Sequence, residues 1–128
     1  MADVRKVWFM AIRDKMRANA APYLEPGETV QAVFGAQTTS AYFVLISIWI
    51  IIFANAYRVI IVTDKRILVG RSGRMSTTPV KEIIRELPRS TRIGAPTGLW
   101  WRSESLGEKL YVHKRFHKDV VEADSLAP

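Results

Sequence analysis

The chain of 128 residues contains no cysteine. A disulfide framework and a thiolate metal site are therefore excluded, and the composition fits a reducing compartment. Charge is missing from one long stretch, because no Asp, Glu, Lys or Arg occurs between Glu28 and Arg58. That stretch contains AYFVLISIWIIIFA at Ala41–Ala54, in which only Ser47 is neither apolar nor aromatic. The rest of the chain is organised around this apolar segment.

Two catalytic motifs are also missing. No Gly-x-Ser-x-Gly nucleophile elbow occurs, and the stretch at 94–98 lacks the Gly-Lys-Ser/Thr that cradles a phosphate. We therefore predict no catalytic residues and no cofactor, and we expect that the protein is not an enzyme.

The two histidines, His113 and His117, stand four residues apart, a spacing that can place two metal ligands on one helical face. Lys114 replaces the glutamate of zinc-binding helices, and the expected junction of a strand with a helix falls between the histidines. Asp119 is the only nearby carboxylate. We therefore predict solvated histidines and no metal site.

The formal net charge of +7 is concentrated after the apolar segment. Residues 1–56 hold five basic and four acidic side chains, whereas residues 57–128 hold fourteen and eight. Such an excess suits an anionic membrane surface or nucleic acid. Acidic residues are mixed with the basic ones and no nucleic-acid-binding motif occurs, which favours the membrane.

Hydrophobic periodicity predicts two helices and a series of short strands. The first helix, Ala2–Ala20, is basic and amphipathic, with Trp8, Ile12 and Met16 on its apolar face; it either packs on the domain or lies on a membrane. Gly35 suggests a β-bulge, and Trp100 and Trp101 should face opposite sides of one strand, one of them toward the core. The expected strands are 29–37, 57–62, 67–70, 75–78, 80–87, 99–103 and 109–113, and the closing helix is 116–126.

As a helix, the apolar segment would be about 21–24 Å long, shorter than the roughly 30 Å hydrocarbon core of a bilayer. This length is typical of re-entrant, interfacial or buried segments, and its many β-branched residues leave a buried strand open. The strands before and after it should pair in one sheet, so we expect it to enter and leave the membrane on the same side. The residues expected to contact the membrane are Tyr42, Phe43, Leu45, Ile46, Ile48, Trp49, Ile50, Ile52 and Phe53.

The hairpin sequence YRVIIVTDKRILV at 57–69 resembles the VTDRRI hairpin of bacterial pleckstrin-homology-like (PH-like) domains. The sequences LPRSTRIG at 87–94 and LYVHKRF at 110–116 are similar to segments of small actinobacterial members of that family. The resemblance covers about residues 27–126. It implies an α+β fold, an antiparallel PH-like partial barrel with a C-terminal helix, and membrane or protein binding without catalysis. To this domain the chain adds the amphipathic helix at 1–22 and an apolar helical insert at 41–54.

These patterns predict a non-catalytic, membrane-associated adaptor on the cytoplasmic side of the cell membrane, either peripheral or re-entrant. Anionic lipids are its expected partner, with a protein partner or a second copy of the chain as a further one. One alternative is a soluble interaction module or assembly subunit whose apolar segment is buried in an oligomer or complex. Another is a basic nucleic-acid-binding protein. The residues expected to form one positive, anionic-surface-binding face near the insert are Arg58, Lys65, Arg66, Arg89, Arg92 and Arg102.

Overall fold

A computed structural model describes residues 4–39, 56–73 and 78–128. The nine residues predicted to contact the membrane lie outside these ranges. So does most of the strand predicted at 75–78. The structural statements below concern the described ranges.

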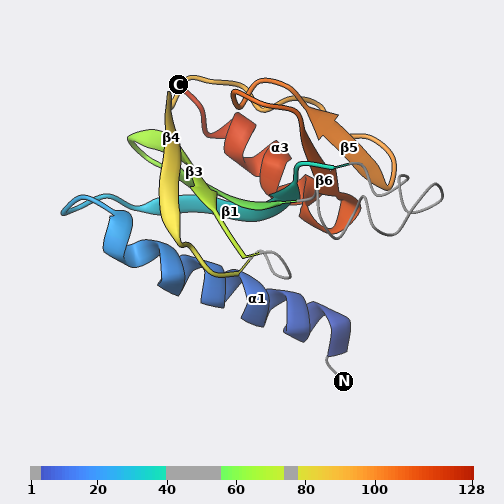
Figure 1. The fold of residues 1–128 in the computed structure, drawn as a ribbon, viewed down its shortest axis with the longest axis horizontal. Helices are drawn as coiled ribbons and strands as arrows, with labels where there is room; N and C mark the ends of the chain where they lie inside the picture. The colour runs from blue at the N-terminus through green and yellow to red at the C-terminus, as the bar shows by residue number, and fades with distance from the viewer. Residues whose placement is uncertain (1–3, 40–55, 74–77) are drawn as a thin grey trace.

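The fold is α+β, with a curled six-stranded antiparallel sheet in the form of a half-barrel (Figure 1). The strand order is β4-β3-β2-β1-β6-β5, which matches the predicted antiparallel partial barrel. Each of the other predicted strands is present, with ends within two residues of the prediction. The elements are α1 (Val4–Ala20), β1 (Val30–Gln37), β2 (Tyr57–Thr63), β3 (Arg66–Arg71), β4 (Glu82–Pro88), β5 (Trp100–Ser103), β6 (Leu110–His113) and α3 (His117–Ser125), with short 3₁₀ helices at Ala21–Tyr23 and Lys114–Phe116.

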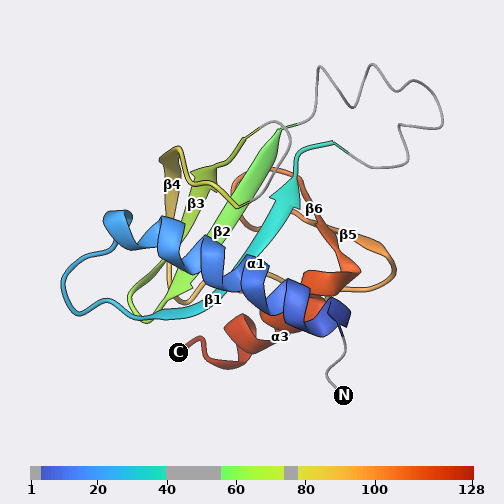
Figure 2. The same ribbon diagram turned by 90° about the horizontal axis from the view of Figure 1, so that it is seen from below.

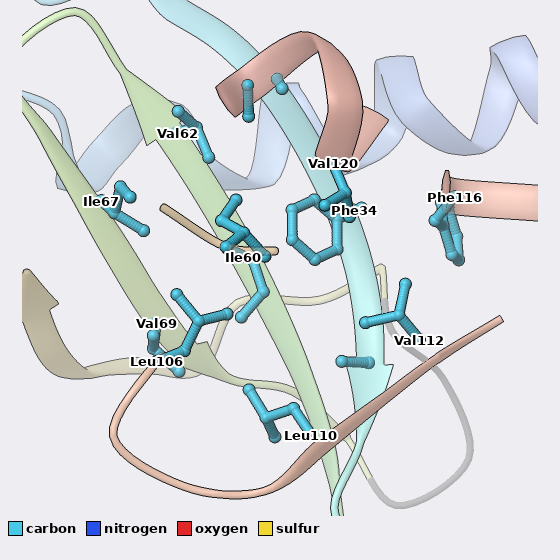
Figure 3. Packing of buried hydrophobic residues seen from close by; sticks show 14 residues of the cluster. Phe34, Ile60, Val62, Ile67, Val69, Leu106, Leu110, Val112, Phe116 and Val120 are labelled. Carbon is cyan, nitrogen blue, oxygen red and sulfur yellow. The ribbon is translucent and has the colours of Figure 1, made fainter. Parts of the chain in front are cut away.

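The strands β1, β2 and β3 are buried on both faces, which explains their nearly continuous apolar sequences. Their concave face packs against α3 through a core that includes Phe34, Ile60 and Val120 (Figure 3). Trp101 packs against this core from β5, whereas Trp100 has the opposite orientation and contacts His113. The prediction that the two tryptophans face opposite sides is therefore confirmed.

The helix α1 lies across the other, convex face of the sheet (Figure 2). Met16 and Ala20 are fully buried there against Val33, Val59 and neighbouring apolar side chains, with Ile12 partly buried beside them. Of the predicted apolar face, Met16 and Ile12 therefore pack on the sheet, whereas Trp8 is 56% exposed.

An ion pair fastens the middle of α1 to the start of α3. Arg13 donates from Nη2 to Asp119 Oδ2 at 3.0 Å and to the Arg115 carbonyl at 3.1 Å. Burial raises the pKa of Asp119 above its ordinary value, although the hydrogen bond from Arg13 acts in the opposite direction. The hydrogen bond from Arg13 therefore stabilises the charged form of the buried Asp119 carboxylate.

The strands β1 and β2 pair along their whole length, from Val30 opposite Thr63 to Gln37 opposite Tyr57. The predicted pairing of the strands on either side of the apolar segment is therefore confirmed. The register shift lies between Val30 and Ala32, whereas Gly35 pairs regularly with Val59. The bulge predicted at Gly35 is therefore wrong, because the sheet accommodates its extra residue at Gln31.

No helix within the described ranges has both the length and the apolar character needed to cross a bilayer.

Candidate functional site

The six basic residues predicted to bind an anionic surface lie at two ends of the sheet. Lys65 lies in the β2–β3 turn and Arg66 begins β3, whereas Arg58 lies next to the end of β2 at which the apolar segment returns. At about 3.3 Å per residue, the length of β2 separates these two ends by roughly 20 Å. The structure therefore does not bring the six residues onto one face.

Arg66 has a structural role at the end of the sheet away from the apolar segment. Its guanidinium pairs with the buried carboxylate of Glu28 at 2.9 Å and with Glu86 at 3.2 Å. Lys65, which is exposed, lies 3.9 Å from Glu25. Of these two cations Lys65 is the more exposed, with 47% of its side-chain surface accessible against 16% for Arg66.

Arg89 is buried at the same end of the sheet, with 6% of its surface exposed. It donates from Nε and Nη2 to the side-chain oxygen of Gln31, and from Nη2 to the Ala123 carbonyl at 2.8 Å. Burial lowers the pKa of Arg89, an effect that Asp124 opposes. Arg92 is exposed and donates to the Asp124 carbonyl. Arg89 therefore joins β1 to the C-terminus of α3, and its position is not that of a surface-binding residue.

Arg58 and Arg102 lie at the end of the sheet from which the apolar segment leaves. Arg58 pairs with Glu108 at 3.2 Å, and Arg85 of β4 pairs with the same carboxylate oxygen at 2.9 Å. Arg102 is half-exposed and pairs with Glu104. The register places Arg102 opposite Tyr111, which is in turn opposite Gln37 at the end of β1.

An aromatic hollow lies at this end of the sheet. It lies where β1 and β6 meet at a single residue pair, Gln37 and Tyr111. Strand alternation places Gly35, Gln37, Tyr57, Trp100 and His113 on the convex face of the sheet. The lining residues are Gly35, Ala36, Gln37, Tyr57, Trp100, His113, Arg115 and Phe116.

Trp100 and His113 form one wall of the hollow. Their rings meet edge to face, with centroids 4.9 Å apart. The Nδ1 atom of His113 accepts a hydrogen bond from the Arg115 backbone N–H at 3.1 Å, so the neutral ring carries its proton on Nε2. Burial lowers the pKa of His113, and the charges of Arg115 and His117 lower it further. The histidine is therefore a neutral hydrogen-bond donor at physiological pH.

The opposite wall of the hollow carries positive charge. The Arg115 guanidinium lies 5.0 Å from the centre of the Phe116 ring, and burial lowers the pKa of this arginine. Lys114 is exposed beside it. The hollow is consequently apolar and aromatic inside, with cationic side chains at its margin.

His117, the second histidine, faces away from the hollow. Its Nε2 lies 3.1 Å from the Val112 carbonyl, and its ring meets Trp101 on the concave side of the sheet. The two histidines therefore do not converge, since a strand end and a 3₁₀ turn separate them. The described ranges contain no group of three or more His, Cys, Asp or Glu side chains arranged to hold a metal ion.

The sequence analysis did not identify the hollow, although one of its signals was present. Gly35 interrupts an otherwise regular strand, and a glycine inside a strand often marks a close approach of a ligand or backbone. The lining residues come from five elements, namely β1, β2, β5, β6 and the 3₁₀ helix Lys114–Phe116, and only the fold brings them together.

Comparisons of the chain with protein-family models, with curated proteins and with solved structures give no match.

Proposed function

We propose that the protein is a non-catalytic, membrane-associated adaptor with a PH-like domain, acting at the cytoplasmic face of the cell membrane. The PH-like assignment is supported by a curled antiparallel sheet with a helix at its C-terminus. It is also supported by the hairpin YRVIIVTDKRILV, which forms β2 and β3.

The observation that carries the proposal is the joining of the two ends of the apolar segment. The Thr38 N–H donates to the Ala56 carbonyl at 2.9 Å, and the Ala56 N–H donates to Thr38 Oγ1 at 2.9 Å. The chain therefore leaves the sheet and returns to it at one point. A single crossing of the bilayer would separate these partners by the thickness of the membrane and would break both bonds together with the β1–β2 pairing. A segment that dips into one leaflet keeps both bonds.

Basic residues at the same end of the sheet favour the cytoplasmic side. Arg58, Arg102 and Lys114 lie near the point where the apolar segment joins the fold. Cytoplasmic flanks of membrane segments are enriched in Lys and Arg, and the cytoplasmic leaflet carries anionic lipids.

Flotation with vesicles tests the proposal. The variants Ile48→Asp and Trp49→Asp each place a carboxylate in the apolar segment, where it costs on the order of 3 kcal/mol in a bilayer. Binding to vesicles of phosphatidylcholine and phosphatidylglycerol should fall on the order of 100-fold. Thermal unfolding should stay unchanged. Val121→Asp, at an exposed apolar position on α3, is the matched control and should bind normally.

Two results would contradict the proposal. Unchanged flotation of both variants would show that the apolar segment does not hold the protein at the membrane. Unfolding or dissociation of an oligomer, with no vesicle binding by the natural chain, would assign the segment to the interior of a complex.

A further inference from the structure

We propose that the N-terminal half of α1 forms a second membrane contact, in which Val7, Trp8 and Met10 enter the headgroup region of an anionic leaflet. The inference deepens the function proposed above and rests on it for the membrane as partner. The helix and the apolar segment at 41–54 would then hold one domain at one leaflet. The evidence is the exposure of this half of the helix, its position and the charges around it.

The first half of α1 exposes large apolar side chains. Val7, Trp8 and Met10 are each more than half exposed, whereas Met16 in the second half is fully buried. Val7 precedes Met16 by about two and a half helical turns, so it points away from the sheet on which Met16 packs. The sequence Val7–Ile12 contains no charged residue. This part of the helix therefore presents apolar surface that the sheet does not cover.

Arg13 fixes this half of the helix near the place where the apolar segment joins the fold. Its guanidinium donates to the Arg115 carbonyl at 3.1 Å and to Asp119 Oδ2 at 3.0 Å. Arg115 lines the aromatic hollow together with Gln37 and Tyr57, which pair where the apolar segment leaves and returns. The exposed side chains precede Arg13 by at most about 9 Å of helix. In both views of the fold the N-terminal end of α1 lies toward the same end of the molecule as the end of β1 (Figures 1 and 2), so one bilayer surface can meet both.

The charges around this apolar surface favour an anionic partner. Among the exposed side chains that the structure describes in α1 and at 114–122, basic residues outnumber acidic ones; the basic ones are Lys15, Arg17, Lys114 and Lys118, and the acidic ones are Asp14 and Glu122. Apolar side chains beside basic ones are typical of helices that lie at a membrane surface, and tryptophan favours the boundary between membrane and water. The pattern therefore fits an anionic leaflet.

The extent of the exposed surface argues against a protein as its partner. Three half-exposed side chains offer at most roughly 400 Å² of accessible surface, because even the largest side chains bury only about 250 Å². A stable protein interface takes about 800 Å² from each partner. A leaflet sets no such minimum, because shallow insertion of these side chains adds to the contact that the apolar segment makes from the same rigid domain.

Flotation of the full-length protein with vesicles of phosphatidylcholine and phosphatidylglycerol tests the contact. Val7→Asp places a carboxylate on the outward side of α1 and should lower binding about tenfold or more. Leu126→Asp makes the same change of charge at an exposed apolar position at the C-terminal end of α3, and it should leave binding unchanged. Val7→Ser removes apolar surface without adding charge and should also weaken binding. Thermal unfolding should be the same in all three variants, because the substituted side chains are exposed.

A single thiol can report the depth of the helix directly, because the natural chain has no cysteine. The variants Met10→Cys and Leu126→Cys are each labelled with a nitrobenzoxadiazole dye, whose fluorescence rises in an apolar environment. With phosphatidylglycerol-containing vesicles, the label in Met10→Cys should brighten and should be quenched by lipids that carry a spin label near the headgroup. The label in Leu126→Cys should show neither change.

Equal binding by Val7→Asp and the natural chain would overturn the inference, as would a label in Met10→Cys that vesicles neither brighten nor protect from water. A lower thermal stability of Val7→Asp would also overturn it, because protein would then cover this position. Failure of the function proposed above gives a different result. Loss of flotation in Val7→Asp but not in Trp49→Asp would support the contact of α1 and contradict that of the apolar segment, and the reverse result would refute α1 alone.

Discussion

Arg66 donates two hydrogen bonds to the carboxylate of Glu28, from Nε to Oε2 at 2.9 Å and from Nη2 to Oε1 at 3.0 Å. The Glu28 side chain is fully buried, and it also accepts the Thr63 hydroxyl at 2.6 Å and the Glu25 N–H at 2.9 Å. This pair joins the turn before β1 to the β2–β3 turn. Both turns lie at the end of the sheet away from the apolar segment.

Glu28 makes stability depend on pH in the acid range. The hydrogen bonds from Arg66, and to a lesser extent Thr63, lower the pKa of Glu28 from 4.5 to about 2 despite its burial. Because the pKa in the folded state is the lower one, the stabilisation is complete above about pH 4.5 and is lost as the pH falls toward 2. Acid unfolding followed by tryptophan fluorescence should show this loss. In Glu28→Gln the same interval should be nearly flat, and an unchanged slope would contradict the assignment.

Arg13 and Asp119 provide a second prediction, because they fasten α1 to α3. Removing the arginine leaves a buried carboxylate without its cation, which typically costs about 3–5 kcal/mol. Arg13→Met should therefore lower the free energy of unfolding more than the paired change Arg13→Met with Asp119→Leu. Chemical denaturation of the two variants measures this difference. A loss in the paired variant that equals or exceeds the loss in Arg13→Met would contradict this role of the pair.

Arg89 and Arg92 differ in burial and give a matched comparison. Arg89→Lys removes the planar fork that serves both Gln31 and the Ala123 carbonyl, so we expect a loss of about 2 kcal/mol or more. Arg92 is exposed, and Arg92→Lys should change stability by less than about 0.5 kcal/mol. Urea denaturation provides both values, and equal losses would contradict the buried role of Arg89.

The sheet was predictable because its strands carry strong local signals. YRVIIV at 57–62 is apolar at nearly every position, and the structure buries β2 against a helix on each face. The closing helix and the opposite orientations of Trp100 and Trp101 likewise follow from period and alternation. These features depend on neighbouring residues in the sequence.

The placement of the basic residues was not predictable in the same way. Arg58 and Lys65 are close in sequence, but an extended strand carries them to opposite ends of the sheet. Arg89 looks like a surface cation until β1 and α3 enclose it. The hollow depends on the register between β1 and β6, which no local pattern specifies.

Arg102 and Lys65 test whether membrane contact occurs at the insert end of the sheet. Their side chains are 51% and 47% exposed, and each pairs with one exposed glutamate. Near an anionic surface each charge contributes on the order of 1 kcal/mol, and the effect fades within about 10 Å at 0.1 M salt. Arg102→Glu should therefore weaken binding to phosphatidylglycerol vesicles about tenfold, whereas Lys65→Glu, roughly 20 Å away, should not. A larger effect of Lys65→Glu would place the membrane contact at the opposite end.

The absence of cysteine permits a direct test of how the apolar segment enters the membrane. The variants Ser40→Cys and Asn55→Cys each introduce one thiol at an end of the segment, and Ser90→Cys marks an exposed position on the domain. Because Thr38 and Ala56 are hydrogen-bonded, both ends should lie on the side of the membrane that holds the domain. A membrane-impermeant maleimide added to sealed inverted vesicles, which expose the cytoplasmic face, should label all three variants. Labelling of Ser40→Cys and Asn55→Cys from opposite sides would mean that the segment crosses the bilayer and that the β1–β2 pairing does not survive in the membrane.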